Sequence, residues 1–469
     1  MESLVFDLLI KNASVVLSTG ILEGYSVGIK DKKIVAVKRD SEIAQNSKRV
    51  INAEGLHLFP GMIDPHCHLG SGDSRSYEYM EESFKKDTQD CLLGGVTTIA
   101  TTTVLSPDSL DESYRKTVKV ATGNSHTNFK ITCVVTQDHH AKQIKAAYNE
   151  GCTSFKFYTG YCGCLAEKMG MGVDGIPPAL FYKCVEEAVA LPTKPLMMIH
   201  AEEPTVRFML ADRFKEANRE SLIDWAEHSP EWSESVQVYQ YGVIAKQFNL
   251  PLYIVHISKA HTINFIRTLQ NDGYPIVAET CVGFLSTTAH DLVAKGVGIY
   301  AKIQPPIRYK SDQEILWKAI REGIVTAIGT DSIPYTSKYK DGQKFWDARP
   351  GLNIQTPDSM SLLLNEGYHQ DRITLPDLVK VTSELPALHF GISSRKGAIK
   401  EGLDADLVLV DLNKEITLGL HRYKGHNNYS LWEGKKAKGA VVKTIVGGEV
   451  VVDDDEIISP ALGQHLGVL

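Results

Sequence analysis

The segment Phe59-Pro-Gly-Met-Ile-Asp-Pro-His-Cys-His68 begins as a short apolar run and ends on two histidines. The run at residues 58–63 is typical of a buried strand. If the extended conformation continues, alternate side chains point to the same face, so the rings of His66 and His68 lie side by side. Two imidazoles in that geometry can share one cation. The segment therefore predicts a buried strand that delivers two histidines to one site.

The pattern of an apolar run followed by a helical stretch recurs through the middle of the chain. Seven further runs are expected to be strands: 97–101, 129–135, 153–157, 196–200, 252–256, 276–279 and 324–330. Helical stretches such as 178–190, 233–248 and 260–271 lie between them. Eight strands, each followed by a helix, indicate an α/β chain that forms a (β/α)8 barrel. The alternative is an open doubly wound sheet, but no glycine-rich dinucleotide loop follows the first strand.

Both ends of the chain read as strands and turns. Near the N-terminus, residues 27–31 and 33–37 form a plausible hairpin. Near the C-terminus, residues 443–446 and 450–452 form another around Gly447-Gly448. We expect residues 1–58 and 391–469 to pair into one small β-sandwich domain, and residues 59–390 to form the barrel.

Four chemically active residues fall at or near the expected C-terminal ends of barrel strands: Lys156, His200, His256 and Asp331. In a barrel of this class the active site is built at that end of the strands. A single strand-end histidine is more often a satisfied core residue, and a strand-end lysine is usually solvated. Together with the two histidines of the first strand, however, the four predict a metal site.

The composition limits which binding partners and which cellular compartment we expect. The chain has 469 residues, 23% of them charged, with a net charge of −7 and no basic patch of the kind that nucleic acid requires. The chain contains no run of about 18 apolar residues, so we expect no membrane span. The N-terminus lacks the basic and apolar regions of a signal peptide. The eight cysteines have no repeating spacing and are expected to be reduced, mostly buried thiols. We therefore expect a cytoplasmic protein.

These motifs resemble those of the amidohydrolase superfamily, and within it the dihydropyrimidinase and D-hydantoinase branch of the cyclic amidohydrolases. The resemblance covers nearly the whole length. Besides residues 59–68, it rests on Gly94-Gly-Val-Thr-Thr98, Ser154-Phe-Lys156, His200-Ala-Glu202, His256-Ile-Ser258, Glu279-Thr-Cys281, Gly329-Thr-Asp331 and Gly402-Leu-Asp-Ala-Asp-Leu407. It implies a barrel with a β domain built from both termini, which agrees with the organisation above.

The resemblance also implies two divalent metal ions, with zinc as the default. His66, His68 and Asp331 would hold one ion, His200 and His256 the other, and a Lys156 carboxylated by carbon dioxide would bridge them. The modification has a physical reason. An unmodified lysine has a reference pKa of about 10.4, so it is a cation at neutral pH and would repel metal ions. A neutral lysine can take up carbon dioxide, which gives an anion with two oxygens that can bridge two cations.

The implied reaction is binuclear metal-dependent hydrolysis of a cyclic amide C–N bond in a dihydropyrimidine, hydantoin or related ring. The product would be an N-carbamoyl amino acid or an analogous opened ring. Asp331 would accept a proton from the attacking water and donate it to the leaving ring nitrogen. Tyr161, five residues after Lys156, would stabilise the oxyanion.

The expected partner is a small cyclic amide. Residues 350–363 can be laid over the branch's substrate loop without a gap. Gln304 and Gly351 stand where the branch usually has serine and asparagine, and their main-chain groups are expected to bind the ring imide. These departures point to a ring outside the commonest ones. The stretch 162–175 is expected to be either a mobile lid over the ring substituent or an ordinary loop.

Other functions stay open at this point. An allantoinase or a dihydroorotase-like hydrolase is the main alternative, although dihydroorotases usually carry an arginine where this chain has Gly70. A non-catalytic scaffold homologue would have lost metal ligands, and a one-metal deaminase would lack the bridging lysine. The resemblance further implies a homo-oligomer, either a dimer or a tetramer.

Overall fold

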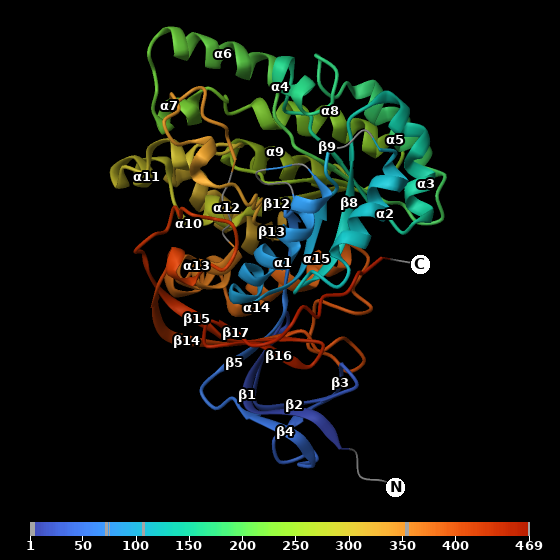
Figure 1. The fold of residues 1–469 in the computed structure, drawn as a ribbon, viewed down its shortest axis with the longest axis vertical. Helices are drawn as coiled ribbons and strands as arrows, with labels where there is room; N and C mark the ends of the chain where they lie inside the picture. The colour runs from blue at the N-terminus through green and yellow to red at the C-terminus, as the bar shows by residue number, and fades with distance from the viewer. Residues whose placement is uncertain (1–4, 71–73, 75, 106–107, 352–355, 468–469) are drawn as a thin grey trace.

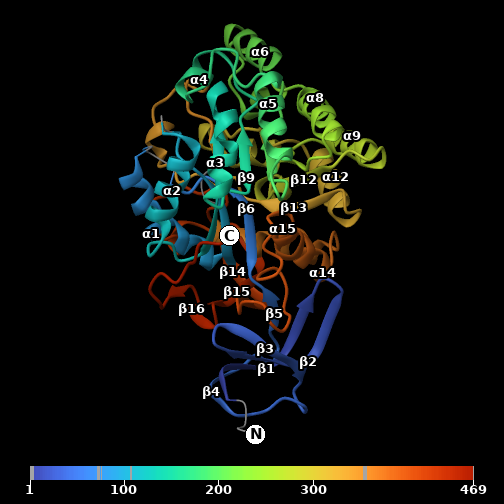
Figure 2. The ribbon, with the colours of Figure 1, turned by 90° about the vertical axis from the view of Figure 1, so that its right-hand side faces the viewer.

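The computed structural model describes residues 5–70, 74, 76–105, 108–351 and 356–467. The chain forms a barrel of strands wrapped by helices and, at one end of it, a sheet built from both termini (Figures 1 and 2). The N-terminal strands, drawn in blue, lie beside the C-terminal strands, drawn in red, although they are hundreds of residues apart in sequence.

Eight parallel strands form the barrel in sequence order. They are β6 (Met62–Cys67), β7 (Val96–Thr102), β8 (Asn128–Val135), β9 (Ser154–Phe157), β10 (Leu196–Ile199), β11 (Leu252–Ile254), β12 (Ile276–Cys281) and β13 (Val325–Gly329). The sheet closes on itself beyond β13, where the main-chain N–H of Asp331 donates to the carbonyl of His66 at 2.9 Å. The N–H of His68 likewise donates to the carbonyl of Ser332 at 2.8 Å. The expected (β/α)8 barrel is confirmed.

Helices follow each of these strands. The main ones are α1 (Tyr77–Leu93), α2 (Leu110–Ala121), α3 (Ile144–Asn149), α5 (Pro178–Val189), α8 (Ser233–Gln247), α9 (Ala260–Asn271), α12 (Lys310–Arg321) and α13 (Ser359–Glu366). Shorter or additional helices are α4 (Gly163–Lys168), α6 (Pro204–Glu216), α7 (Leu222–Glu227), α10 (Val282–Ser286), α11 (Ala289–Lys295), α14 (Leu375–Val379) and α15 (Leu385–His389). No helix in the described part of the chain is long and apolar enough to cross a membrane.

Strands from both ends of the chain form the second, mixed sheet. They are β1 (Phe6–Leu17), β2 (Gly20–Lys30), β3 (Lys33–Arg39), β4 (Ser47–Asn52), β5 (His57–Pro60), β14 (Leu407–Thr417), β15 (Lys436–Val446), β16 (Glu449–Asp453) and β17 (Glu456–Ile457). They are ordered β17-β16-β15-β14-β5-β1-β2-β3, with β4 paired to β1. Since β5 pairs with both β1 and β14, it joins the two termini. The expected β unit is therefore present, while its residue boundaries with the barrel stay a prediction.

The run at residues 58–63, expected to be one barrel strand, is two strands in two different sheets. β5 ends at Pro60 in the terminal sheet, and β6 begins at Met62 in the barrel. Gly61 makes the transition in a tight space, since a Cβ there would lie 2.0 Å from Oγ1 of Thr97. Both strands are buried, so the apolar run continues through the change of sheet, and periodicity cannot detect it.

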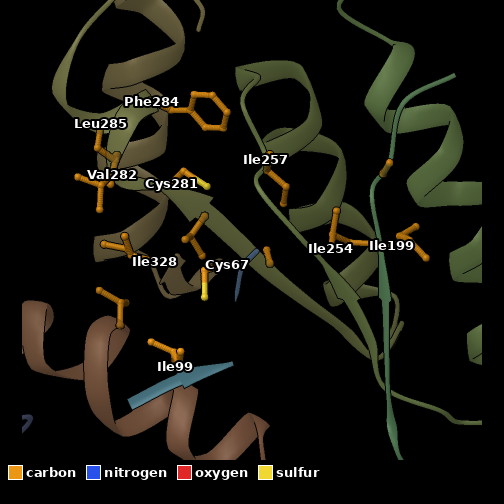
Figure 3. Close-up of a cluster of buried hydrophobic side chains, with 14 of the residues drawn as sticks. Cys67, Ile99, Ile199, Ile254, Ile257, Cys281, Val282, Phe284, Leu285 and Ile328 are labelled. Carbon is orange, nitrogen blue, oxygen red and sulfur yellow. The ribbon is translucent and has the colours of Figure 1, made fainter. Parts of the chain in front are cut away.

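The barrel strands alternate between the site and an apolar layer beneath the helices. Cys67, which lies between His66 and His68 at the end of β6, belongs to a large buried cluster that includes Cys281, Ile328 and Ile99 (Figure 3). Neighbouring side chains on a strand point to opposite faces. The packing of Cys67 among these apolar side chains therefore directs its two histidine neighbours to the opposite side.

Candidate metal centre

The six residues expected to bind metal meet at the C-terminal end of the barrel. They come from β6, from β9, and from the residues that follow β6, β10, β11 and β13. Four of them, together with Tyr158, Tyr161 and other side chains, line a cavity of about 130 Å³. Its wall is formed by His68, Thr102, Thr103, Leu105, Tyr158, Tyr161, Leu165, Met169, His200, His256, Gln304, Asp331, Ile333, Tyr335, Arg349, Pro350 and Gly351. Polar and apolar side chains therefore share the wall of one small cavity.

His66, His68 and Asp331 form one half of the site. Nε2 of His68 lies 3.0 Å from Oδ1 of Asp331, and Nε2 of His66 lies 3.5 Å from the same oxygen. Each of the three residues offers one potential metal-ligand atom, and these three atoms lie within 4.8 Å of one another. Two imidazoles and a carboxylate so close together can coordinate one divalent cation.

His200, His256 and Lys156 complete the arrangement. The rings of His200 and His256 have their centroids 4.4 Å apart, and the His256 ring lies 5.4 Å from that of His66. Nζ of Lys156 lies 2.9 Å from Nε2 of His66. Lys156 is completely buried. The lysine amine therefore contacts the first group of donors, and His256 connects the second group to the same centre.

Three of the histidine rings contact a side chain outside the centre through one ring nitrogen. The other nitrogen of each ring is then directed toward the centre. Nδ1 of His66 contacts Glu279 at 3.1 Å, and Nδ1 of His68 contacts Thr102 at 3.0 Å. A third ring, that of His200, has its Nε2 2.9 Å from Glu202. Such partners fix the tautomer and the orientation of metal-binding histidines. The inward nitrogens are thus Nε2 of the first two rings and Nδ1 of the third.

Sequence reasoning assigned no role to Glu279, which connects several parts of the site. Besides its contact with His66, its carboxylate accepts hydrogen bonds from the main-chain N–H of His256 at 3.0 Å and from the Tyr253 hydroxyl at 2.8 Å. Glu202 has a similar position on the other side, where it accepts hydrogen bonds from Ser229 and from the side-chain amide of Gln304. Both are fully buried acids, and each lay within a motif quoted for the family resemblance.

Two of the expected ligands adopt a strained backbone conformation. His256 has a φ of +43° and Asp331 a φ of +52°. Each lies two residues after the end of a barrel strand, His256 after β11 and Asp331 after β13. The left-handed region is uncommon for residues other than glycine, and it persists where the surrounding structure enforces it, most often at functional sites. The conformation turns both side chains into the mouth of the barrel.

Burial of the centre disfavours the charged forms of its side chains. Burial lowers the pKa of Lys156 to about 8, although Asp331 and Glu279 oppose that change. Burial also raises the pKa of the Glu279 carboxyl to about 8. The pKa of His66 falls well below its usual value through burial and the nearby Lys156. Neutral imidazoles and a neutral amine are the forms that coordinate metal or react with carbon dioxide, and bound cations would favour the carboxylates.

Tyr161 and Tyr158 both line the cavity. The ring centroid of Tyr161 lies 5.0 Å from that of His200, whereas the Tyr158 hydroxyl lies 3.5 Å from Nδ1 of His68. Burial raises the pKa of Tyr161, although the nearby Arg207 lowers it. The Tyr161 phenol is therefore protonated at neutral pH and can donate a hydrogen bond to an oxyanion.

The two residues expected to bind substrate, Gln304 and Gly351, also line the cavity. The N–H of Gly351 donates to the carbonyl of Lys302 at 3.2 Å, and its own carbonyl accepts from Nζ of Lys340 at 3.3 Å. The side-chain amide of Gln304 donates to Glu202. Its Oε1 is buried and has no hydrogen-bond partner within the described residues. These hydrogen bonds hold the main chain of Gly351 and the side chain of Gln304 in place at the cavity wall.

The stretch 162–175, expected to be a lid or an ordinary loop, contains the short helix α4. Its main chain folds back on itself, and the N–H of Gly163 donates a hydrogen bond of 2.6 Å to the carbonyl of Val173. Leu165 and Met169 from this segment contribute to the cavity wall. The segment therefore covers part of the cavity with apolar side chains.

Comparison with known proteins gives matches over almost the full length. Residues 57–451 match the model of a family described as the amidohydrolase family. The chain is 28% identical to a D-hydantoinase of Ralstonia pickettii over 467 residues, which is 98% of each chain. It is 26% identical to an L-hydantoinase of Paenarthrobacter aurescens, again over 98% of each. An allantoinase of Rubrobacter xylanophilus is 27% identical, with 98% of this chain and 97% of the relative covered.

Solved structures agree with these sequence matches. A D-hydantoinase structure superposes with a TM-score of 0.89 at 28% identity and covers 98% of this chain and 99% of its own. The structure of an L-hydantoinase (dihydropyrimidinase) from Arthrobacter aurescens gives the same TM-score at 25% identity, with the same coverage. The similarity extends through both the barrel and the terminal sheet.

Proposed function

The chain belongs to the amidohydrolase family, and from this membership we propose that it is a metal-dependent hydrolase that opens cyclic amides at a ring C–N bond. The ring would be a hydantoin, a dihydropyrimidine or a close relative, and the product an N-carbamoyl amino acid or its analogue. The observation that carries the proposal is the convergence of six side chains at the C-terminal end of the barrel, four of them lining one small cavity: His66, His68, Asp331, Lys156, His200 and His256. Full-length similarity to hydantoinases supports it.

The donor set fits two divalent metal ions. His66, His68 and Asp331 would hold one, and His200 and His256 the other. The fit rests on the inward orientation of the ring nitrogens, which the outer partners enforce. When bound, the ions would activate water as a nucleophile at neutral pH and polarise the ring carbonyl. Imidazole and carboxylate donors suit zinc, which we propose as the metal.

Lys156 is proposed to be carboxylated on Nζ and to bridge the two ions. Its burial and its 2.9 Å contact with Nε2 of His66 support this role. An ammonium group at this position would repel cations, whereas a carbamate is an anion with two oxygen donors. The lowered lysine pKa of about 8 makes the neutral amine, the form that reacts with carbon dioxide, accessible near neutral pH.

Asp331 and Tyr161 are proposed to act on the substrate itself. Oδ1 of Asp331 faces His66 and His68, and the Asp331 side chain lines the cavity. The carboxylate can therefore accept the proton of the attacking water and return it to the leaving ring nitrogen. The protonated phenol of Tyr161 would donate a hydrogen bond to the carbonyl oxygen as negative charge develops there.

Among the alternatives, allantoin stays a candidate ring because allantoinases are relatives over the full length. Dihydroorotate is disfavoured by the surroundings of Gly70. That residue has a φ of +93°, and a Cβ on it would lie 2.6 Å from Cγ of Met80. An arginine at this position, which would bind the substrate carboxylate, does not fit without rearrangement.

Two further properties are proposals that follow from family membership and composition. We propose that the chain forms a homo-oligomer, either a dimer or a tetramer, and that it works in the cytoplasm. Size-exclusion chromatography with light scattering would test the first. Cell fractionation would test the second.

The reaction is tested by a ring-opening assay with the metal-loaded protein. The panel would contain dihydrouracil, 5-substituted hydantoins, allantoin, dihydroorotate and cyclic imides, with loss of the ring followed by ultraviolet absorbance and mass spectrometry. We expect opening of at least one hydantoin or dihydropyrimidine. A metal-loaded protein that opens none of these rings would contradict the proposal.

A further inference from the structure

Arg349 brings a guanidinium group to the wall of the cavity that holds the metal centre. The side chain is partly exposed. Its Cζ lies 4.5 Å from the ring centroid of Tyr335 and 5.0 Å from that of Tyr339. Its main-chain N–H donates to the carbonyl of Tyr339. Aromatic faces attract a guanidinium group and restrict its motion, so the two rings hold the cation in place.

The support for Arg349 depends on Gly351. A Cβ at position 351 would lie 2.5 Å from Cε2 of Tyr335. The branch that this chain resembles usually has asparagine at that position, so a side chain there would displace the tyrosine. Gly351 therefore leaves room for the ring of Tyr335. That ring in turn packs against the guanidinium group of Arg349.

Arg349 has no carboxylate partner among the residues that the structure describes. The acidic side chain on the described wall of the cavity is Asp331, and it faces the histidines of β6. A guanidinium group forms strong, often bidentate hydrogen bonds with carboxylates, so one held beside a cavity without such a partner can bind an anion from outside. A ligand that pairs with Arg349 needs an anionic group.

We propose that Arg349 binds a carboxylate carried on a substituent of the cyclic amide, so that the preferred substrates are rings with an acidic side chain. This inference rests on the proposed function, because it names the substrate class of the same site. The planar guanidinium would donate a pair of hydrogen bonds to the two carboxylate oxygens.

Pairs of substrates that differ in charge but have nearly the same shape test whether the site prefers a carboxylate. The probes are 5-carboxymethylhydantoin and 5-(2-carboxyethyl)hydantoin, each compared with its uncharged primary amide, which has nearly the same shape. In the wild-type protein we expect kcat/KM for the acid to exceed that for the amide by about 10- to 100-fold at one or both lengths, the range for a charge-assisted hydrogen bond. The advantage should shrink as salt is added, since ions screen exposed charges.

The variant Arg349→Gln should reduce the acid-to-amide ratio to about one, and Arg349→Lys should leave an intermediate ratio. Because each ratio is measured within one enzyme preparation, a general loss of activity does not obscure it. Arg321→Gln is the matched control, because this exposed arginine ends α12 just before the N-terminal end of β13, away from the site. It should keep the wild-type ratio.

Two outcomes would overturn the inference: a wild-type ratio near one at both lengths, or a ratio that survives Arg349→Gln. Opening of the neutral amides with no preference for the acids would contradict the substrate class and leave the ring-opening function standing. Failure to open any ring would instead contradict the proposed function.

Discussion

Nδ1 of His66 lies 3.1 Å from Oε1 of Glu279, although 213 positions separate the two residues in the sequence. The contact orients the ring so that its Nε2 faces Lys156 and Asp331. The same carboxylate oxygen accepts the main-chain N–H of His256, a proposed ligand of the second metal. One buried acid thus positions groups that belong to both halves of the centre.

Replacing Glu279 with leucine should therefore weaken metal binding by about 10- to 100-fold, the range seen when the partners of metal-ligating histidines are removed. Glu279→Gln keeps an oxygen acceptor and should retain more of the affinity. Metal titration with a competing chelator would measure both variants. Equal metal affinity in the leucine variant and the wild type would show that the contact does not position the ring.

Removing the Tyr161 hydroxyl should lower kcat by about 10²- to 10³-fold with a smaller change in KM, because the hydrogen bond forms mainly to the developing oxyanion. Tyr158→Phe is the matched comparison, since it removes a hydroxyl from the same cavity. Steady-state kinetics on the two variants would separate their roles. A larger kcat loss for Tyr158→Phe would assign the oxyanion contact to Tyr158 instead.

Gly160 packs against the ring of His200, and a Cβ there would lie 2.3 Å from Cδ2 and 2.6 Å from Nε2 of that histidine. Gly160→Ala should therefore displace His200 and lower occupancy of the second metal position. Gly172→Ala is the control, because its added Cβ meets nothing within 4 Å. Metal analysis of both purified variants would test this, and full metal content in Gly160→Ala would count against the placement of His200 in the centre.

The barrel was predictable because its strands are buried apolar runs separated by helices. The error at residues 58–63 has a physical cause. β5 and β6 are both buried, so hydrophobicity does not change at Gly61, where the chain leaves one sheet and enters the other.

The proposed metal ligands were predictable because they occur in family motifs at strand ends. Their outer partners were not, because Glu279 contacts His66 from β12, a strand that does not pair with β6, and Thr102 contacts His68 from the neighbouring β7. Arg349 carried no motif at all, and its position depends on the packing of Tyr335 beside Gly351. Such contacts are properties of the folded chain.

Asp404 connects the terminal sheet with the segment that follows the barrel, through Lys33, Arg395 and Lys396. Burial alone would raise its pKa, but Lys396 and the other two cations lower it to about 2. An unfolded aspartate has a pKa of about 3.9. The folded state is therefore stabilised by this carboxylate above about pH 4, and the contribution disappears as pH falls toward 2.

Asp404→Asn should accordingly lower Tm at pH 7, and its deficit relative to the wild type should shrink between pH 4 and pH 2. Asp453→Asn, which removes a more exposed partner of Lys443 in the same sheet, should change Tm little. Thermal unfolding followed by circular dichroism across this pH range provides the measurement. A deficit that is constant with pH would argue against the ion-pair origin.

The most direct test of the two-metal account is the number of metal ions bound per chain, measured by inductively coupled plasma mass spectrometry together with ring opening on the same preparation. The account predicts two ions per chain in protein prepared with bicarbonate, loss of activity on chelation, and recovery when metal returns. In Lys156→Ala it predicts fewer than two ions and almost no ring opening. An active wild-type enzyme with one ion or none, or a fully active Lys156→Ala variant with two, would contradict it.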